Sequence, residues 1–164
     1  MSRNLILSHA QVQQKIARIA AEISEKNFLE NEIILTGIIG NGFLLAKLIA
    51  DELFKLGCKS KVLEIKIDKK KPEIAKIDLS ENIDIENKSV VLVDDVLNSG
   101  KTFSFAMASL LDKKVNKIQS AVLINRSYKD FPVHADFVGL SLSTTLEEHV
   151  SVEISVNSIE AYLH

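Results

Sequence analysis

The chain has little of three things that would each point to a class of protein: cysteine, net charge and long apolar runs. Its single cysteine, Cys58, cannot form a disulfide within the chain and follows Gly57 at the expected end of a helix, so we interpret it as a structural thiol. Apolar runs such as Val90 to Val93 are far too short to span a bilayer, and the first residues lack the charged-then-apolar pattern of a secretion signal. We therefore expect a cytoplasmic protein with no membrane partner.

The formal net charge of −2 provides no general attraction to nucleic acid. RNA binding through a local basic patch stays open, although the overall charge does not favour it. The chain has 164 residues, of which 46% are hydrophobic and 26% charged, which is the balance of a globular protein. We find no internal repeat and no linker, so residues 1–164 are expected to form a single domain.

Three helices are expected from the spacing of apolar residues. Ser8 and Gln11 have the spacing of a capping box, and the apolar residues after them predict an amphipathic helix over residues 9–26. A second helix follows a glycine-rich turn and ends at Gly57, with its inner face formed by Leu44, Leu45, Leu48, Ile49, Leu53 and Leu56. A third is expected from about Thr102 to Lys113.

Apolar strands are expected at residues 33–35, 62–67, 89–95 and 118–124. The alternation over residues 74–79 predicts a partly exposed antiparallel strand, and shorter β-like pieces follow around Phe137 and at residues 150–154. The order strand, helix, three strands, helix, strand favours an α/β fold with a mostly parallel central sheet flanked by helices. The remainder, residues 125–164, is expected to form in part a small cap on that sheet.

Two turns of this expected sheet are rich in glycine. Four of the six glycines in the chain lie in them, namely Gly37, Gly40, Gly42 and Gly100. Ligands of open α/β sheets bind beyond the carboxyl ends of the strands, and glycine lets backbone N–H groups approach an anion at the start of the following helix. Both turns therefore have the character of phosphate sites.

The second turn lies in the stretch SVVLVDDVLNSGKT, residues 89–102, where an apolar strand delivers two adjacent aspartates. A nucleoside-triphosphate loop is excluded, because the position of its first glycine is Asp95. The dinucleotide fingerprint G-x-G-x-x-G does not match the glycine spacing of the first turn either. Asp94 and Asp95 can instead accept hydrogen bonds from the two hydroxyls of a ribose, while the loop after them wraps a 5-phosphate. The first turn can hold a pyrophosphate that magnesium bridges to the ribose.

The stretch SVVLVDDVLNSGKT resembles the phosphoribosyl-pyrophosphate signature of type I phosphoribosyltransferases. TGIIGNGFLLAKLIADEL is similar to the pyrophosphate loop and its helix in that family, and AVLINRSYKDFPVHADFVGLSLSTT is similar to the stretch that leads to the hood over the base. Within the family the chain most resembles the pyrimidine operon regulators that are also uracil phosphoribosyltransferases. The resemblance implies phosphoribosyl pyrophosphate and a nucleobase as substrates, magnesium as cofactor, and a homodimer or higher homo-oligomer.

The resemblance also implies roles for particular residues. Asp94 and Asp95 would be catalytic, holding the ribose and, with the ligand, magnesium. The remaining residues fall into four groups: the 5-phosphate loop Val96, Leu97, Asn98, Ser99, Gly100, Lys101 and Thr102; the pyrophosphate loop Thr36, Gly37, Ile38, Ile39, Gly40, Asn41 and Gly42; the base region Asn125, Arg126, Phe137, Val138 and Gly139; and a flexible closing loop with Lys69, Lys70 and Lys71.

Two positions depart from the family pattern. Purine-using relatives have an aspartate where this chain has Asn98, and an amide cannot act as a base, which favours a pyrimidine. The regulators carry Thr-Arg-Gly where this chain has Gly40-Asn41-Gly42, so a cation facing the pyrophosphate is missing. A non-catalytic or weakly catalytic nucleotide-sensing regulator of pyrimidine genes remains an alternative, and so does a purine (hypoxanthine or guanine) phosphoribosyltransferase. We interpret His149 as an ordinary surface or strand histidine.

Overall fold

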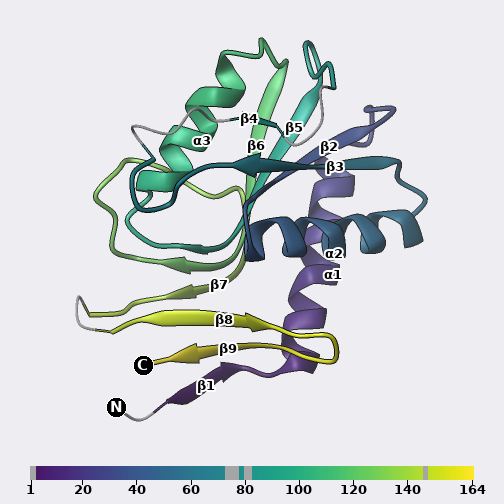
Figure 1. Ribbon diagram of the computed structural model, residues 1–164. Helices are drawn as coiled ribbons and strands as arrows, with labels where there is room; N and C mark the ends of the chain where they lie inside the picture. The colour runs from purple at the N-terminus through teal and green to yellow at the C-terminus, as the bar shows by residue number, and fades with distance from the viewer. Residues whose placement is uncertain (1–2, 73–77, 80–82, 146–147) are drawn as a thin grey trace.

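The computed structural model describes residues 3–72, 78–79, 83–145 and 148–164 (Figure 1). The elements in this part of the chain are β1 (Asn4–Leu7), α1 (His9–Lys26), β2 (Ile33–Ile38), α2 (Asn41–Lys55), β3 (Ser60–Lys66), β4 (Asp78–Leu79), β5 (Ser89–Leu97), α3 (Lys101–Leu111), β6 (Lys117–Arg126), β7 (Phe137–Leu142), β8 (Val150–Ile154) and β9 (Ile159–Leu163). No helix among these residues is long and apolar enough to cross a membrane.

The main sheet has the strand order β4-β3-β2-β5-β6-β7. Five of its strands, β3, β2, β5, β6 and β7, run parallel, and β4 pairs antiparallel with β3 at the edge. The mostly parallel sheet expected from the apolar strands is therefore confirmed. Of the antiparallel strand expected at residues 74–79, only Asp78–Leu79 lies within the described residues, and it does pair antiparallel; residues 74–77 lie outside them.

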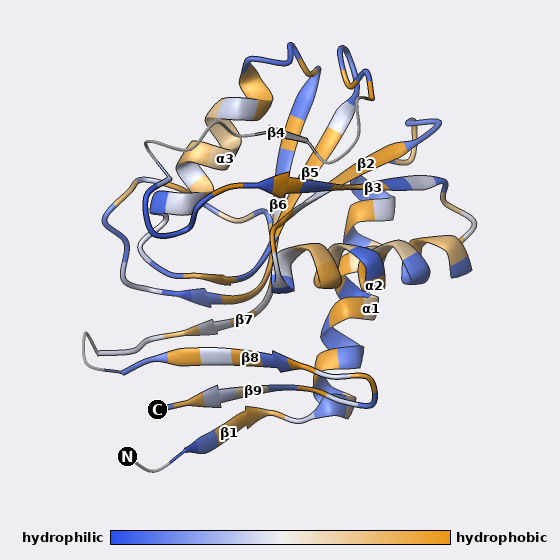
Figure 2. Cartoon of the chain, viewed as in Figure 1, coloured by the Kyte–Doolittle hydropathy of each residue, from blue (hydrophilic) through white to orange (hydrophobic). Residues whose placement is uncertain are grey.

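Helices cover both faces of the main sheet, as the sequence predicts. Alternate residues of one strand enter different cores, because side chains of a strand point to opposite faces in turn. Leu35 of β2 packs with α1 and α2, whereas its neighbour Ile34 packs with α3. The central strands β2 and β5 are hydrophobic over most of their length, in agreement with burial on both faces (Figure 2).

A second, three-stranded antiparallel sheet has the order β1-β9-β8. It brings the N-terminal strand beside the C-terminal one, and the two ends of the chain lie close together (Figure 1). Of residues 125–164, β7 belongs to the main sheet, while β8 and β9 form the second sheet together with β1. Neither β1 nor β9 is predicted by the sequence pattern.

The first helix begins with the predicted capping box. Ser8 accepts a hydrogen bond from the backbone N–H of Gln11, and the Gln11 side chain accepts one from the backbone N–H of Ser8. Five buried residues of α1, Val12, Ile16, Ile19, Ala20 and Ile23, then face the core. This cap fixes the start of α1 directly after β1, so the second sheet is joined to α1 by a single residue, Ser8.

The parallel strands end at one edge of the main sheet, and register decides which loops meet there. In the β2–β5 pair, Gly37 lies opposite Val93. The first glycine turn, which follows β2, therefore lies level with Asp94 and Asp95 at the end of β5. The two segments that the sequence singles out are adjacent for this reason.

Candidate active site

The acid pair lies at the end of β5. Asp94 is buried, with an exposed fraction of 6%, whereas Asp95 is half-buried. The Asp94 carboxylate accepts the backbone N–H of Asp95 at 3.0 Å, and the Asp95 carboxylate accepts that of Val96 at 2.9 Å. These local bonds hold both carboxyl groups close to the backbone at the end of β5.

Burial dominates the electrostatics of Asp94. It raises the pKa of this carboxyl from 3.8 to about 8, with the charge of Asp95 as the next cause. Lys69 opposes the shift, because its ammonium lies 3.4 Å from Asp94 Oδ1. The site thus holds a carboxyl group whose ionisation is favoured by added positive charge or by hydrogen-bond donors from a ligand.

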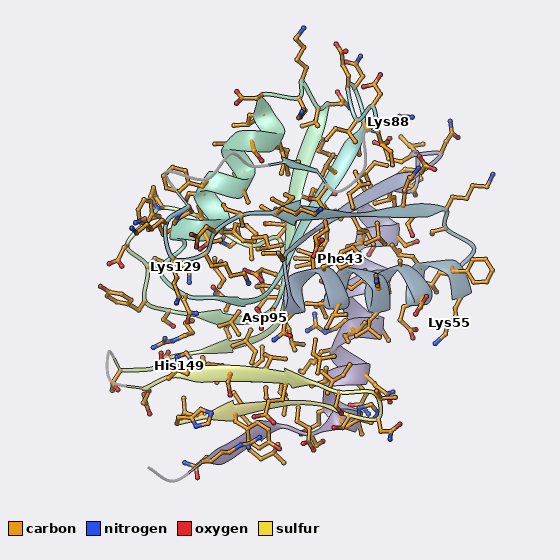
Figure 3. The ribbon with its side chains drawn as sticks, in the orientation of Figure 1. Phe43, Lys55, Lys88, Asp95, Lys129 and His149 are labelled. Carbon is orange, nitrogen blue, oxygen red and sulfur yellow. The ribbon has the colours of Figure 1, made fainter. Side chains whose placement is uncertain are left out.

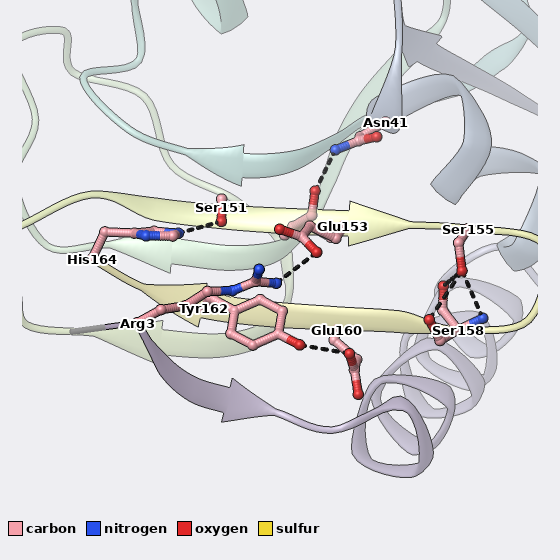
Figure 4. Close-up of polar contacts among 10 residues, drawn as sticks. Arg3, Asn41, Ser151, Glu153, Ser155, Ser158, Glu160, Tyr162 and His164 are labelled. Carbon is pink, nitrogen blue, oxygen red and sulfur yellow. Dashed lines mark hydrogen bonds and ion pairs between the residues drawn. The ribbon is translucent and has the colours of Figure 1, made fainter. Parts of the chain in front are cut away.

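Asn41 connects three parts of the fold at this point. Its amide nitrogen donates to Asp95 Oδ2 at 2.8 Å. It also donates to the backbone oxygen of Val152 in β8 at 2.8 Å (Figure 4). Both amide hydrogens are therefore committed, one to the acid pair and the other to β8. The start of α2, the end of β5 and the second sheet are held together by one side chain.

The loop after the acids turns sharply into α3. Gly100, the residue before the helix, has φ of 87°, which is the left-handed region, and a Cβ there would meet Val133 Cγ2 at 2.4 Å. The backbone oxygen of Ser99 accepts the N–H groups of Asp130 and Phe131, each at 3.0 Å. The loop is thus fixed from outside by residues 130–133, and the first-turn N–H groups of α3 start from this edge, which suits an anion.

A pocket of about 450 Å³ collects these parts. It is lined by both aspartates, residues 96–103, Asn41, Lys69 and residues 149–152. Asp95 and His149 lie on two sides of it, one at the end of β5 and the other just before β8 (Figure 3). The structure therefore brings together every residue expected in the ribose and 5-phosphate site.

The first glycine turn contributes less to the lining than the sequence predicts. Of Thr36 to Gly42, only Asn41 is among the described residues that line the pocket. Thr36 is fully buried and donates to the backbone oxygen of Val91 at 3.3 Å. Gly42 supports the site from behind, because a Cβ on it would lie 2.9 Å from Asp94 Oδ1. Ile38 is buried and Ile39 is partly exposed.

Of the three lysines expected in a closing loop, Lys69 alone lines the pocket in the described part of the chain. Lys70 and Lys71 are exposed beyond it, and the backbone N–H of Lys70 is held by Asp68 at 2.8 Å.

The expected base region divides into two groups. Arg126 lies beside the pocket, since its guanidinium donates to Asn98 Oδ1 at 3.0 Å, and Asn125 accepts from Lys129 at 2.9 Å. Phe137 is instead buried in the core under β7, with an exposed fraction of 2%. The backbone oxygens of Val138 and Gly139 are held by one guanidinium nitrogen of Arg18 in α1, both at 2.9 Å. None of these five residues belongs to the described pocket lining.

Two polar residues near the site carry no signal in the sequence. His149 lines the pocket, because the register of β8 and β9 places it at the end of the second sheet, where its backbone pairs with that of His164. Lys129 donates to Asn125 and to the backbone oxygens of Leu97 and Arg126; burial, and then the charge of Arg126, lower its pKa. Both positions depend on contacts between segments distant in the sequence, which a residue pattern does not reveal.

A parallel α/β sheet with a glycine loop that leads into a helix at its carboxyl edge is typical of a protein that binds a phosphorylated ligand. The family model described as "Phosphoribosyl transferase domain" matches residues 2–157. The chain belongs to the phosphoribosyltransferase family, as the sequence resemblance predicts, and it is a phosphoribosyltransferase. Phosphoribosyl pyrophosphate is the co-substrate that this family implies.

Curated relatives match along nearly the whole chain. "Bifunctional protein PyrR" of Clostridium kluyveri is 36% identical over 170 residues, covering 96% of this chain and 96% of its own. The protein of the same name from Chloroflexus aurantiacus is 37% identical over 160 residues, covering 91% and 87%. These are members of the regulator group that the sequence resembles.

Solved structures confirm the fold. The hypoxanthine phosphoribosyltransferase of Trypanosoma cruzi superposes with a TM-score of 0.80 over 96% of this chain and 95% of its own, at 13% identity. An enzyme of Leishmania tarentolae described as "HGPRT-ase", solved in complex with GMP, gives 0.76 over 90% and 84%, at 20% identity. At such identities the likeness extends to the fold alone.

Proposed function

We propose that this protein transfers the ribose 5-phosphate group of phosphoribosyl pyrophosphate to uracil and releases pyrophosphate. The observation that carries the proposal is the pocket of about 450 Å³, in which the acid pair and the complete loop to Thr102 face one space. The family match supports the transfer reaction in general. The choice of uracil rests on Asn98 and on the resemblance to the pyrimidine regulators.

In this proposal Asp94 and Asp95 hold the two ribose hydroxyls, and residues 96–102 hold the 5-phosphate. The turn from Thr36 to Gly42 lies beside the acid pair and holds the pyrophosphate, with Asn41 as its polar contact to the pocket. Among the described residues no group of three or more His, Cys, Asp or Glu side chains is arranged to hold a metal ion. Two carboxylates fit magnesium that keeps water and ligand oxygens as its other ligands.

The transfer forms a bond from a ring nitrogen of the base to the anomeric carbon. The bond from that carbon to the pyrophosphate oxygen breaks with its electron pair leaving on pyrophosphate, and the proton of the ring nitrogen passes to water. Magnesium, when bound, supplies positive charge to the leaving group. The carboxylates hold the sugar while positive charge develops on its ring, and Lys69 with its neighbours helps to exclude the water that would otherwise hydrolyse the donor.

A screen of purified protein with phosphoribosyl pyrophosphate, magnesium and six bases tests the proposal: uracil, hypoxanthine, guanine, adenine, xanthine and orotate. We expect uracil to be turned over fastest. The double variant Asp94→Asn, Asp95→Asn should lose at least about a hundredfold in turnover, since it removes both ribose ligands. The matched control is Asp112→Asn, an exposed residue at the end of α3.

Two results contradict the proposal. One is the absence of any calorimetric signal for phosphoribosyl pyrophosphate with the wild-type protein. The other is turnover in the double variant equal to that of the Asp112→Asn control.

A second candidate function is a regulator that keeps the pocket but has weak catalysis. Asn41 favours it, because its side chain is neutral and places no cation beside a pyrophosphate. Both of its amide hydrogens are also already used, by Asp95 and by the backbone oxygen of Val152. Nucleotide binding without turnover of any of the six bases would support this function. A purine phosphoribosyltransferase is the third candidate, and hypoxanthine or guanine turned over faster than uracil would support it. A cytoplasmic location, expected from the apolar runs of the sequence, and a homo-oligomer, implied by the family resemblance, remain predictions.

A further inference from the structure

Arg126, at the end of β6, joins two loops on the rim of the pocket. Its Nε donates to Thr144 Oγ1 at 2.8 Å, and one terminal nitrogen donates to the backbone oxygens of Thr145 and Glu148 at 3.0 and 2.9 Å. The other terminal nitrogen donates to Asn98 Oδ1 at 3.0 Å. Three of these four bonds fix the guanidinium to the segment that precedes β8, and the fourth extends to the loop after the acid pair.

This contact decides which way the Asn98 amide points. A guanidinium has only donors, so the atom of Asn98 that faces it must be the oxygen. The amide nitrogen, with its two hydrogens, is then the end directed away from Arg126. Asn98 lines the pocket and is exposed there, whereas Arg126 is not part of the lining. An Asn98 side chain held in this way offers its N–H groups, and not its oxygen, to a ligand in the pocket.

We propose that Arg126 is a positioning residue that fixes Asn98 as a hydrogen-bond donor to the incoming base, and that this pair selects a base with a carbonyl oxygen next to its reacting nitrogen. The inference rests on the proposed function and deepens it. Arg126 acts through Asn98 and is not itself a catalytic residue.

The chemistry of the two base classes explains the selection. In uracil the reacting nitrogen N1 is flanked by the C2 carbonyl, whose oxygen accepts a hydrogen bond from the Asn98 amide. In a 6-oxopurine that reacts through N9, the proton to be lost can reside on N7, in the same ring, so an acceptor beside that ring assists the reaction. A fixed N–H donor opposes it, because two donors face each other and one stays unsatisfied.

The experiment compares uracil with hypoxanthine in four variants. Arg126→Gln introduces an acceptor and releases the Asn98 amide, so the ratio of kcat/KM for uracil over hypoxanthine should fall about tenfold, the effect of one hydrogen bond. Arg126→Lys keeps a donor-only group and should retain most of the ratio. Asn98→Asp places an acceptor in the pocket and should lower the ratio by tenfold or more. The control Arg3→Gln removes an exposed arginine that stacks on Tyr162 and pairs with Glu153, and should leave the ratio unchanged.

The KM for phosphoribosyl pyrophosphate separates positioning from a general structural effect. We expect it to stay within about threefold of the wild-type value in Arg126→Gln, since Arg126 bonds to the 5-phosphate loop only at the Asn98 side chain among its described side-chain hydrogen bonds, none of which involves the acid pair. A second readout uses calorimetry to measure the affinity for UMP, whose C2 oxygen can accept the same hydrogen bond, and it does not depend on turnover. This affinity should fall about tenfold in Arg126→Gln and Asn98→Asp and persist in Arg126→Lys and in the control Arg3→Gln.

The inference and the proposed function fail in different ways. Wild-type protein that does not turn over uracil contradicts the proposed function. An unchanged affinity for UMP in both Arg126→Gln and Asn98→Asp contradicts the inference, whichever base the wild type turns over. An equal loss of turnover with both bases in Arg126→Gln also contradicts it, because that is the result of a structural role only.

Discussion

The protonation of Asp94 links the stability of this protein to pH. Burial raises the pKa of Asp94 from 3.8 to about 8 in the folded state, so between these values the folded chain binds a proton that the unfolded chain has lost. The free energy of unfolding is therefore highest below about pH 4 with respect to this group and falls as pH rises toward 8. A residue suited to hold a ligand thus makes the unliganded fold less stable at neutral pH.

Replacing Asp94 by Asn tests this link. The amide imitates the protonated carboxyl at every pH and retains an oxygen for the Asp95 N–H. At pH 8 the variant should be more stable than the wild type by on the order of 5 kcal/mol, since the pKa shift from 3.8 to about 8 contributes roughly 1.4 kcal/mol per unit. This corresponds to a rise in Tm of roughly 10 to 20 °C for a chain of this size. Near pH 4 the two proteins should unfold at the same temperature.

Thermal unfolding followed by circular dichroism from pH 4 to 9 provides the measurement, with Asp112→Asn as the control for loss of an exposed carboxyl. A difference in Tm between Asp94→Asn and wild type that stays constant over this range would contradict the assignment. Saturating phosphoribosyl pyrophosphate and magnesium should reverse the order, because they stabilise only the protein that binds them.

At the scale of the elements, two different physical constraints require glycine at two positions near the β2–α2 turn. Gly40 has φ of 88° and open space where a Cβ would lie, so it is required by backbone conformation. Gly37 has no such conformation, but a Cβ on it would lie 2.4 Å from the Cα of Phe43. It is required by the close approach of the strand end to the first turn of α2.

The two substitutions should therefore differ in cost. Gly40→Ala should lower the free energy of unfolding by about 1 to 2 kcal/mol, because its φ of 88° with ψ of −128° is a backbone conformation that almost only glycine adopts. Gly37→Ala should lower it by roughly 2 to 4 kcal/mol, because backbone must move to relieve the overlap. Urea unfolding of both variants measures the difference in the free energy of unfolding. Equal effects would show that the backbone can move to relieve the overlap between residue 37 and Phe43 at little cost.

The elements themselves show how far a sequence can be interpreted. The run from Val90 to Val93 and the capping box of Ser8 are local signals, and both lead to the observed β5 and α1. Strands β1 and β9 are short and partly exposed, and Leu5 of one pairs with Tyr162 of the other across almost the entire chain. No local pattern encodes such a pairing.

The same difference applies to the candidate site. Asp94 to Thr102 are contiguous and form one wall of the pocket, whereas the contacts Asn41 to Val152 and Arg126 to Asn98 join distant segments and become visible only in the fold. Phe137 is a different case: the family resemblance implies a place in the base region, and the structure shows that its side chain is buried in the core, a distinction that the sequence pattern does not make.

At the scale of the whole molecule, the two sheets share one core. Val93 of β5, Val152 of β8 and Ala161 of β9 belong to the same buried cluster as Ile16 of α1. The pocket lies where the sheets meet, and Asn41 spans them. A second sheet that unfolded by itself would remove one wall of the pocket, so the geometry of the site depends on both sheets folding as a unit.

The chain has no tryptophan and two tyrosines, which allows this dependence to be measured. Tyr128 follows β6 of the main sheet, and Tyr162 lies in β9 of the second sheet. Tyr162→Phe therefore leaves a fluorescent probe of the first region, and Tyr128→Phe leaves a probe of the second. If residues 1–164 form a single cooperative domain, the urea midpoint seen by tyrosine fluorescence in each variant should equal the midpoint seen by circular dichroism in the same variant. An earlier fluorescence midpoint in Tyr128→Phe alone would instead mean that the second sheet opens before the main sheet, and the pocket would then lose residues 149–152 while the acid pair stayed in place.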